Sequence, residues 1–160
     1  MAEDLNIIGG SKDDQYRSLI PQIKGLLEGE DELIANLANV SAALKEQFNW
    51  LWVGFYLVKK DQLVLGPFQG PVACTRIRKC RGVCGKAWEH AQTLIVPDVE
   101  QFPGHIACSS LSKSEIVIPI VRQREVVGIL DVDSELLDNF DETDQYYLEA
   151  IVAALKFETI

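Results

Sequence analysis

The stretch from residue 49 to residue 68, NWLWVGFYLVKKDQLVLGPF, constrains the fold more than any other part of the chain. It is rich in aromatic and β-branched side chains, which favour extended backbone, and Lys60-Asp61 offers a turn in its middle. We therefore expect two strands joined as a hairpin. A second apolar run, from residue 115 to residue 134, has RQR at its centre and predicts another hairpin. Two hairpins indicate a mostly antiparallel sheet.

Helical patterns flank these strands. Residues 12–28 place apolar side chains on one stripe, which Pro21 is expected to kink or interrupt. Asp31 is expected to cap a second helix and Asp141 to cap a third, because a short acidic side chain accepts hydrogen bonds from a helix N-terminus. The remaining expected elements are two short strands and a short helix, at residues 72–77, 93–96 and 82–92.

This order predicts an α+β fold, with a central sheet and helices against one face of it. We expect one domain over residues 1–160, with N-terminal helices at about 12–47, the sheet and active site at about 50–134, and a C-terminal helix at about 142–158. A chain of 160 residues with 48% hydrophobic residues is long enough to bury a sizeable core.

Charge limits the possible partners. The chain has 15 basic and 24 acidic side chains and a formal net charge of −9. Such a surface repels nucleic acid and anionic membranes, so we expect neither as a partner. The opening MAEDLNIIGG lacks the basic and apolar regions of a secretory signal, and the longest apolar stretch is too short to cross a bilayer. The expected location is the cytoplasm.

The cysteines lie close together in the sequence, at Cys74, Cys80, Cys84 and Cys108. Without a secretory signal they do not indicate a disulfide framework. Cys108 lies in FPGHIACSSLSKSE, among small polar residues and without strand or helix periodicity. The surrounding loop, residues 97–114, is longer than a simple connection requires. We interpret it as a functional loop that presents a reachable thiol.

Three kinds of thiol chemistry can be compared. Zinc favours paired C-x-x-C spacings, which are absent, although His105 and Cys108 could supply two ligands. A cysteine hydrolase needs a base, and His105 lies three residues from Cys108, but a lone loop histidine is more often a plain surface residue. A redox reaction needs a second thiol, which Cys74 at a strand end or Cys84 at a helix N-terminus could supply. The helix dipole would favour the Cys84 thiolate, although Cys84 fits simple core packing equally well.

Acidic residues near these cysteines add a second chemical signal. Asp131 and Asp133 in GILDVDS share one face of the expected strand, because side chains alternate along it. They fit a solvent-facing strand end if taken alone. Together with Glu115 they could instead bind an ammonium group, or share a proton and donate it.

Two aromatic residues lie on one face of the first expected strand. Trp52 and Tyr56 are four residues apart, with Gly54 between them leaving room. Aromatic side chains are ordinary in strands, but these two could also form the wall of a pocket.

Four motifs carry a resemblance to a known family: LGPFQGPVACTRI, GVCGKAW, PDVEQFPGHIACSSLSKSEIVIPI and VVGILDVDS. They resemble the free methionine-(R)-sulfoxide reductases, a branch of the GAF-domain superfamily, from about Asn36 to the C-terminal helix. The resemblance implies a GAF-like α+β domain with a six-stranded antiparallel sheet flanked by helices. It also implies a homodimer and no metal or organic cofactor.

The resemblance also implies roles for single residues. Cys108 matches the catalytic cysteine of the family, Cys74 its main resolving cysteine and Cys84 its third cysteine. The residues that match the substrate pocket are Trp52, Tyr56, Glu115, Asp131 and Asp133. RIRKCRGVCG departs from the family pattern. We therefore expect Cys80, within that stretch, to lie on an exposed turn without a role.

The implied function is an oxidoreductase acting on a sulfur group with a disulfide as acceptor, active in oxidative stress. It would reduce free L-methionine (R)-S-oxide to L-methionine, through a sulfenic acid on Cys108 and a disulfide with Cys74 that thioredoxin or a similar dithiol reduces. Glu115 would polarise the S=O bond, and Trp52 would pack on the S-methyl group.

Two other functions remain open at this point. The first is a small-molecule-sensing GAF module without catalysis, although such modules are usually fused to an effector domain and 160 residues would leave no room for one. The second is a thiol enzyme that reduces peroxides.

Overall fold

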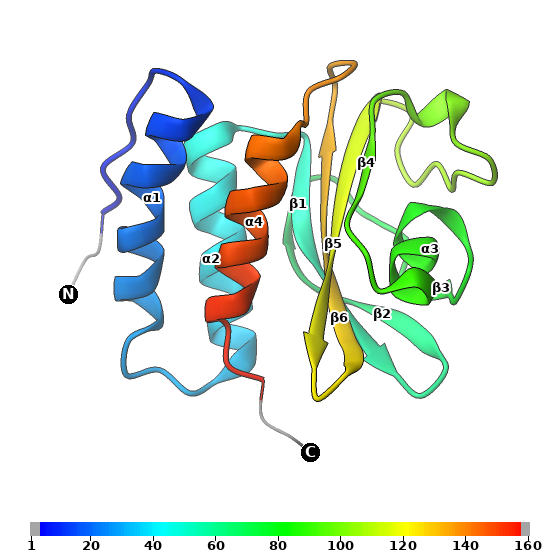
Figure 1. Ribbon diagram of the computed structural model, residues 1–160, viewed down its shortest axis with the longest axis horizontal. Helices are drawn as coiled ribbons and strands as arrows, with labels where there is room; N and C mark the ends of the chain where they lie inside the picture. The colour runs from blue at the N-terminus through cyan, green and yellow to red at the C-terminus, as the bar shows by residue number, and fades with distance from the viewer. Residues whose placement is uncertain (1–3, 158–160) are drawn as a thin grey trace.

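Six strands form one antiparallel sheet in the order β3-β2-β1-β6-β5-β4 (Figure 1). The structure is a computed structural model, and it describes residues 4–157. The strands are β1 (Trp52–Lys59), β2 (Gln62–Gln69), β3 (Arg76–Arg78), β4 (Leu94–Val96), β5 (Ser114–Arg122) and β6 (Glu125–Ser134).

Both predicted hairpins are present and form the centre of the sheet. β1 and β2 turn at Lys60-Asp61, and β5 and β6 turn at Gln123-Arg124. Gln123 and Arg124 have φ angles of 51° and 67°, the left-handed backbone that a two-residue hairpin turn needs. Pairing of β1 with β6 then joins the hairpins side by side.

Helices cover both faces of this sheet (Figure 1). On one face lie α1 (Lys12–Leu27), α2 (Leu33–Phe48) and α4 (Glu142–Ala154), as expected. On the other face lies α3 (Gly82–His90), where the sequence order had suggested helices on one face only. The short 3-10 helix η1 (Val99–Gln101) follows β4.

The pattern of β1 explains the two covered faces. Val53, Phe55 and Leu57 belong to the apolar cluster under the three long helices. Trp52 and Tyr56, at alternate positions, belong to a second cluster on the α3 side. Because both faces of the strand are apolar, burial requires a layer on each side.

The α3 layer is small, and this leaves room for a pocket. Val83, Ala87 and Trp88 of α3 share the second cluster with Val117 of β5 and Ile129 of β6. The helix has nine residues, so it covers only part of this face of the sheet. The uncovered part is bounded by the segment before β3 and by the loop between β4 and β5.

Several element boundaries differ from the prediction. α1 continues past Pro21 as one helix, so the predicted interruption is absent. Glu32 rather than Asp31 caps α2, because its carboxylate accepts the hydrogen bond from the Ile34 backbone N–H. Asp141 caps α4 as predicted, in a capping box with Asp144.

α4 and β3 are both shorter than predicted. α4 ends at Ala154, so residues 155–157 of its predicted range are not helical, and residue 158 lies outside the described part of the chain. β3 begins only at Arg76, so most of the predicted strand at 72–77 is irregular backbone. Within residues 4–157, no helix is long and apolar enough to span a membrane.

Candidate active site

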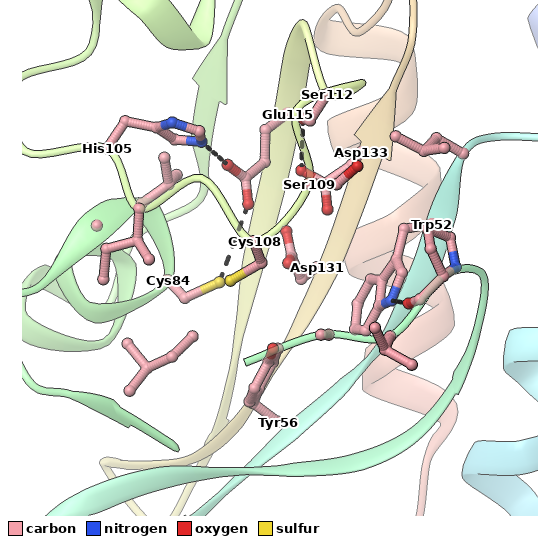
Figure 2. Close-up of a pocket in the computed structure, with 18 of the residues that line it drawn as sticks. Trp52, Tyr56, Cys84, His105, Cys108, Ser109, Ser112, Glu115, Asp131 and Asp133 are labelled. Carbon is pink, nitrogen blue, oxygen red and sulfur yellow. Dashed lines mark hydrogen bonds and ion pairs between the residues drawn. The ribbon is translucent and has the colours of Figure 1, made fainter. Parts of the chain in front are cut away.

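The pocket between α3 and the sheet is lined by all the predicted site residues except Cys74 (Figure 2). The walls come from β1, β5 and β6, from the start of α3, and from two irregular segments that carry cysteines. The predicted residues that line it are Trp52, Tyr56, Cys84, Cys108, Glu115, Asp131 and Asp133, and Cys74 adjoins it through its bond to Cys108.

A disulfide joins Cys74 and Cys108 across the mouth of the pocket. Their Cα atoms are 5.8 Å apart, although 34 residues separate them in the sequence. Cys108 is exposed and Cys74 is half-buried. These are the two cysteines that the resemblance pairs, and Cys108 lies at the protein surface.

Two aromatic side chains hold the segment that carries Cys74. We call residues 71–74 the Cys74 strap. Trp52 donates a hydrogen bond from Nε1 to the Pro71 carbonyl oxygen at 3.1 Å (Figure 2), and Tyr56 donates one from its hydroxyl to the Cys74 carbonyl oxygen at 2.8 Å. The strap is therefore tied to side chains of β1.

Gly54 makes this aromatic wall possible. A Cβ atom at Gly54 would lie 2.3 Å from Cβ of Phe68 and 2.8 Å from the Trp52 ring. Without that atom, Trp52 stacks between Phe68 and Tyr56, with ring centroids 5.2 Å and 5.9 Å away. As expected, Gly54 leaves room for the neighbouring aromatic side chains, and any larger residue would collide with them.

The three predicted acids converge from neighbouring strands. Glu115 on β5 lies opposite Asp133 on β6, and Asp131 is two residues away on the same face. All three side chains point into the pocket (Figure 2). Glu115 and Asp131 are buried, and Asp133 is half-buried and accepts a 3.0 Å hydrogen bond from the Ser112 hydroxyl. A solvent-facing strand end, the simpler interpretation of the two aspartates, is therefore wrong.

Burial makes these carboxyl groups hard to ionise. Burial, followed by the negative charge of Asp133, raises the pKa of Glu115 to about 8. The pKa values of Asp131 and Asp133 are also raised, first by burial and then by the neighbouring acids. Carboxylates this close cannot all be charged at once. At neutral pH the cluster therefore retains protons that it can donate.

Cys84 differs from its prediction. Its Sγ is buried and lies 4.0 Å from Glu115 Oε2 (Figure 2). Burial, followed by the charges of Asp131 and Glu115, raises the pKa of the Cys84 thiol well above its usual range. The expected lowering by the helix dipole is wrong, because desolvation and nearby carboxylates outweigh the end of a short helix.

Two further residues line the pocket: His105, which the sequence offered only as a possible metal ligand or base, and Ser112, which it did not single out. The His105 side chain is only 14% exposed, and its Nε2 lies 3.6 Å from Glu115 Oε1. Burial lowers the pKa of His105. The only sequence signal for both was their place in the loop around Cys108, since their contacts depend on how that loop folds.

Cys80 lies outside the pocket, on an exposed turn as expected, and its thiol is free. Its backbone is left-handed, with φ of 68°. A hydrogen bond with Glu89 raises the pKa of this thiol.

Comparison with known proteins places this geometry in a family. The GAF domain model matches residues 30–157. GAF domain-containing protein A of Dictyostelium discoideum is 67% identical over 156 residues, covering 97% of this chain and 99% of that protein. The free methionine-R-sulfoxide reductase of Escherichia coli is 44% identical over 147 residues, covering 91% and 89%. A crystal structure of free methionine-R-sulfoxide reductase from Neisseria meningitidis in complex with its substrate superimposes with a TM-score of 0.94 at 51% identity, covering 96% of this chain and 93% of that one.

The chain belongs to the free methionine-R-sulfoxide reductases, a family of GAF-domain proteins. Membership confirms both the resemblance read from the motifs and the predicted fold class.

Proposed function

We propose that the protein reduces free L-methionine (R)-S-oxide to L-methionine. The observation that supports this most directly is an accessible cysteine pair, Cys74 and Cys108, placed over a buried cluster of carboxyl groups. Sulfoxide reduction needs these two components, a thiol that accepts the oxygen and an acid that protonates it. The Neisseria meningitidis structure, 51% identical, contains the substrate of that enzyme.

The first step takes place in the reduced enzyme. The Cys108 thiolate attacks the sulfoxide sulfur, and protonated Glu115 donates its proton toward the S=O oxygen. The oxygen then transfers to the Cys108 sulfur while the S=O bond and the bond between Cys108 and the substrate sulfur break. Cys108 becomes a sulfenic acid, and methionine leaves with its sulfur reduced by two electrons. The raised pKa of Glu115 supports this role, because the acid holds a proton at neutral pH.

The remaining pocket residues recognise the substrate. Ionised Asp131 or Asp133 would hold the ammonium group, which a free amino acid has and a residue within a protein lacks. Oδ1 of Asp131 is buried without a hydrogen-bond partner among residues 4–157, so it can accept such a donor. Trp52 would pack against the S-methyl group, while its indole N–H keeps the strap in place.

The second step regenerates the thiols. The Cys74 thiol attacks the Cys108 sulfenic acid, water leaves, and the Cys74–Cys108 disulfide forms. Thioredoxin or a similar dithiol then attacks the exposed Cys108 sulfur and restores both thiols. Thiols supply both electrons, so the cycle needs no organic cofactor. We further propose that the enzyme acts as a cytoplasmic homodimer, as the family resemblance implies.

One assay tests the proposed function. The protein is mixed with NADPH, thioredoxin reductase, thioredoxin and either the R or the S isomer of free methionine sulfoxide. We expect NADPH consumption with the R isomer and little with the S isomer or with an N-acetylated, C-amidated methionine sulfoxide. Binding of the R isomer without turnover would support a sensor instead, and consumption of a hydroperoxide in its place would support a peroxidase.

A further inference from the structure

Three groups at the floor of the pocket could bind a metal ion together. They are the Cys84 thiol and the carboxyl groups of Glu115 and Asp131, and one ligand atom from each lies within 4.8 Å of the other two. All three side chains are buried, and they come from α3, β5 and β6 (Figure 2). Regular elements therefore fix the positions of the three ligands, and the irregular loops contribute none of them.

An unsatisfied atom points to a missing ligand at the same place. Asp131 is 6% exposed, and its Oδ1 atom has no hydrogen-bond partner in the described part of the chain. A buried acceptor without a donor destabilises the folded protein. A cation bound beside Asp131 would remove this destabilisation.

The surroundings of Glu115 also fit a ligand carboxylate. Its Oε2 faces Cys84 at 4.0 Å, whereas Oε1 faces His105 Nε2 at 3.6 Å. Metal-binding carboxylates commonly have such an outer partner, which fixes the orientation of the group. His105 would thus orient Glu115 without contacting the metal.

The ligand types select the metal. Mg²⁺ and Ca²⁺ prefer oxygen ligands alone, whereas Zn²⁺ binds cysteine sulfur together with carboxylate oxygen. Bond lengths of about 2.3 Å to sulfur and about 2.1 Å to oxygen place tetrahedral ligand atoms about 3.5 Å apart. Small side-chain rotations would bring the Cys84, Glu115 and Asp131 atoms to that spacing. Three protein ligands leave the fourth position for water.

We propose that the pocket binds one Zn²⁺ ion through Cys84, Glu115 and Asp131, and that this ion excludes the amino-acid substrate. The thiol and any protonated carboxyl group release their protons to solvent on binding. Cys74 and Cys108 are not ligands, so the oxidised protein with its disulfide intact should bind the ion too. The site therefore stands independently of the proposed reduction cycle.

The experiment uses the oxidised protein, with the Cys74–Cys108 disulfide verified by mass spectrometry. Zn²⁺ is titrated by calorimetry, and Co²⁺ is used as a spectroscopic probe. We expect one equivalent of each metal and a thiolate-to-cobalt charge-transfer band. Cys84→Ser should abolish the band, and Asp131→Asn should weaken binding at least tenfold. Cys80→Ser is the matched control, because Cys80 is the other free thiol and lies outside the pocket, and it should bind like the unmodified protein.

Competition with substrate provides a second measurement. In the oxidised protein, which cannot turn over the substrate, Zn²⁺ should weaken the binding of methionine (R)-S-oxide measured by calorimetry. EDTA should reverse the effect, whereas Mg²⁺ should have none. The proposal is overturned if the oxidised protein binds no Zn²⁺. It is also overturned if Cys80→Ser loses the cobalt band while Cys84→Ser and Asp131→Asn keep it. If the protein binds Co²⁺ in this way but shows no turnover in the NADPH assay, the result supports the metal site and contradicts the proposed function.

Discussion

The hydroxyl of Tyr56 donates a 2.8 Å hydrogen bond to the carbonyl oxygen of Cys74. A rigid central strand thus fixes the backbone of the cysteine that is bonded to Cys108. The alternative is a resolving cysteine on a free loop, which would need to find its partner after each turnover. The same tyrosine lines the pocket, so substrate binding and the placement of the second thiol depend on one side chain.

Replacing Tyr56 with Phe should therefore slow formation of the Cys74–Cys108 disulfide, the step that follows reduction of the substrate. The change removes one hydrogen bond to the Cys74 strap, worth about 1 kcal/mol, which corresponds to roughly a fivefold change in rate. We expect kcat with thioredoxin to fall several-fold, while a single turnover of the reduced enzyme yields methionine at the normal rate. Tyr146→Phe, at an exposed tyrosine, is the control. An equal loss in the first turnover would show that the hydroxyl acts on the substrate instead.

Substitution of the cysteines separates attack from recycling. Cys108→Ser should abolish even a single turnover, whereas Cys74→Ser should form one equivalent of methionine and then fail to recycle with thioredoxin. Cys84 should rescue little, because its thiol is buried and has a raised pKa. Cys80→Ser should behave like the unmodified protein. Peptide mapping after one equivalent of substrate should find Cys74 joined to Cys108, and a dominant Cys80–Cys84 link would contradict the assignment.

Local sequence patterns predicted the parts of the site that lie on regular strands. Spacing by two residues placed Asp131 and Asp133 on one face, and spacing by four did the same for Trp52 and Tyr56. Strand alternation is a local property, so it can be read from neighbouring residues. The pairing of β5 with β6 then adds Glu115 to the same face, which agrees with the expectation for the three acids.

The predictions that were wrong concern features that depend on long-range packing. The position of α3 on the opposite face follows from the apolar residues on both sides of β1, which the order of elements alone does not reveal. The same packing buries Cys84 beside carboxyl groups, so desolvation decided its pKa and the helix dipole did not. His105 contacts Glu115 only because the irregular loop folds back over β5.

Activity should decrease as pH rises through the pKa of Glu115. The group donates a proton in the proposed reaction, and its pKa of about 8 means that the protonated form is lost above that pH. We expect kcat/KM for the R isomer to fall on the alkaline side of about pH 8. Glu115→Gln should remove this limb and lower kcat by a factor on the order of 100. Glu125→Gln, an exposed acid at the β5–β6 turn, should change neither, and a normal kcat in Glu115→Gln would mean that the acid is only structural.

Folding stability should decrease over a related pH range. The pKa of Glu115 rises from its ordinary value of 4.5 to about 8 on folding, so between these values the folded protein binds more protons than the unfolded chain. Stability therefore falls as pH rises across this window, by about 1.4 kcal/mol per pH unit for one proton at most. Urea unfolding at constant ionic strength from pH 5 to pH 8 should show this slope. Glu115→Gln should make the slope smaller, with the remainder due to Asp131 and Asp133, whereas Glu125→Gln should leave it unchanged. An equal slope in both variants would refute the assignment.

His105 should set how quickly Glu115 regains its proton. Its Nε2 lies 3.6 Å from Glu115 Oε1, and burial lowers its pKa, so at neutral pH it is an uncharged imidazole between the acid and solvent. His105→Ala should lower kcat several-fold, because Glu115 would lose the neighbouring base that returns its proton. Added imidazole should restore part of the loss if His105 transfers protons, whereas rescue by His105→Gln alone would indicate that it only positions Glu115. His90→Ala tests the other histidine of the chain, which is exposed at the end of α3. A similar loss of kcat in both alanine variants would show that the contact with Glu115 is not the cause.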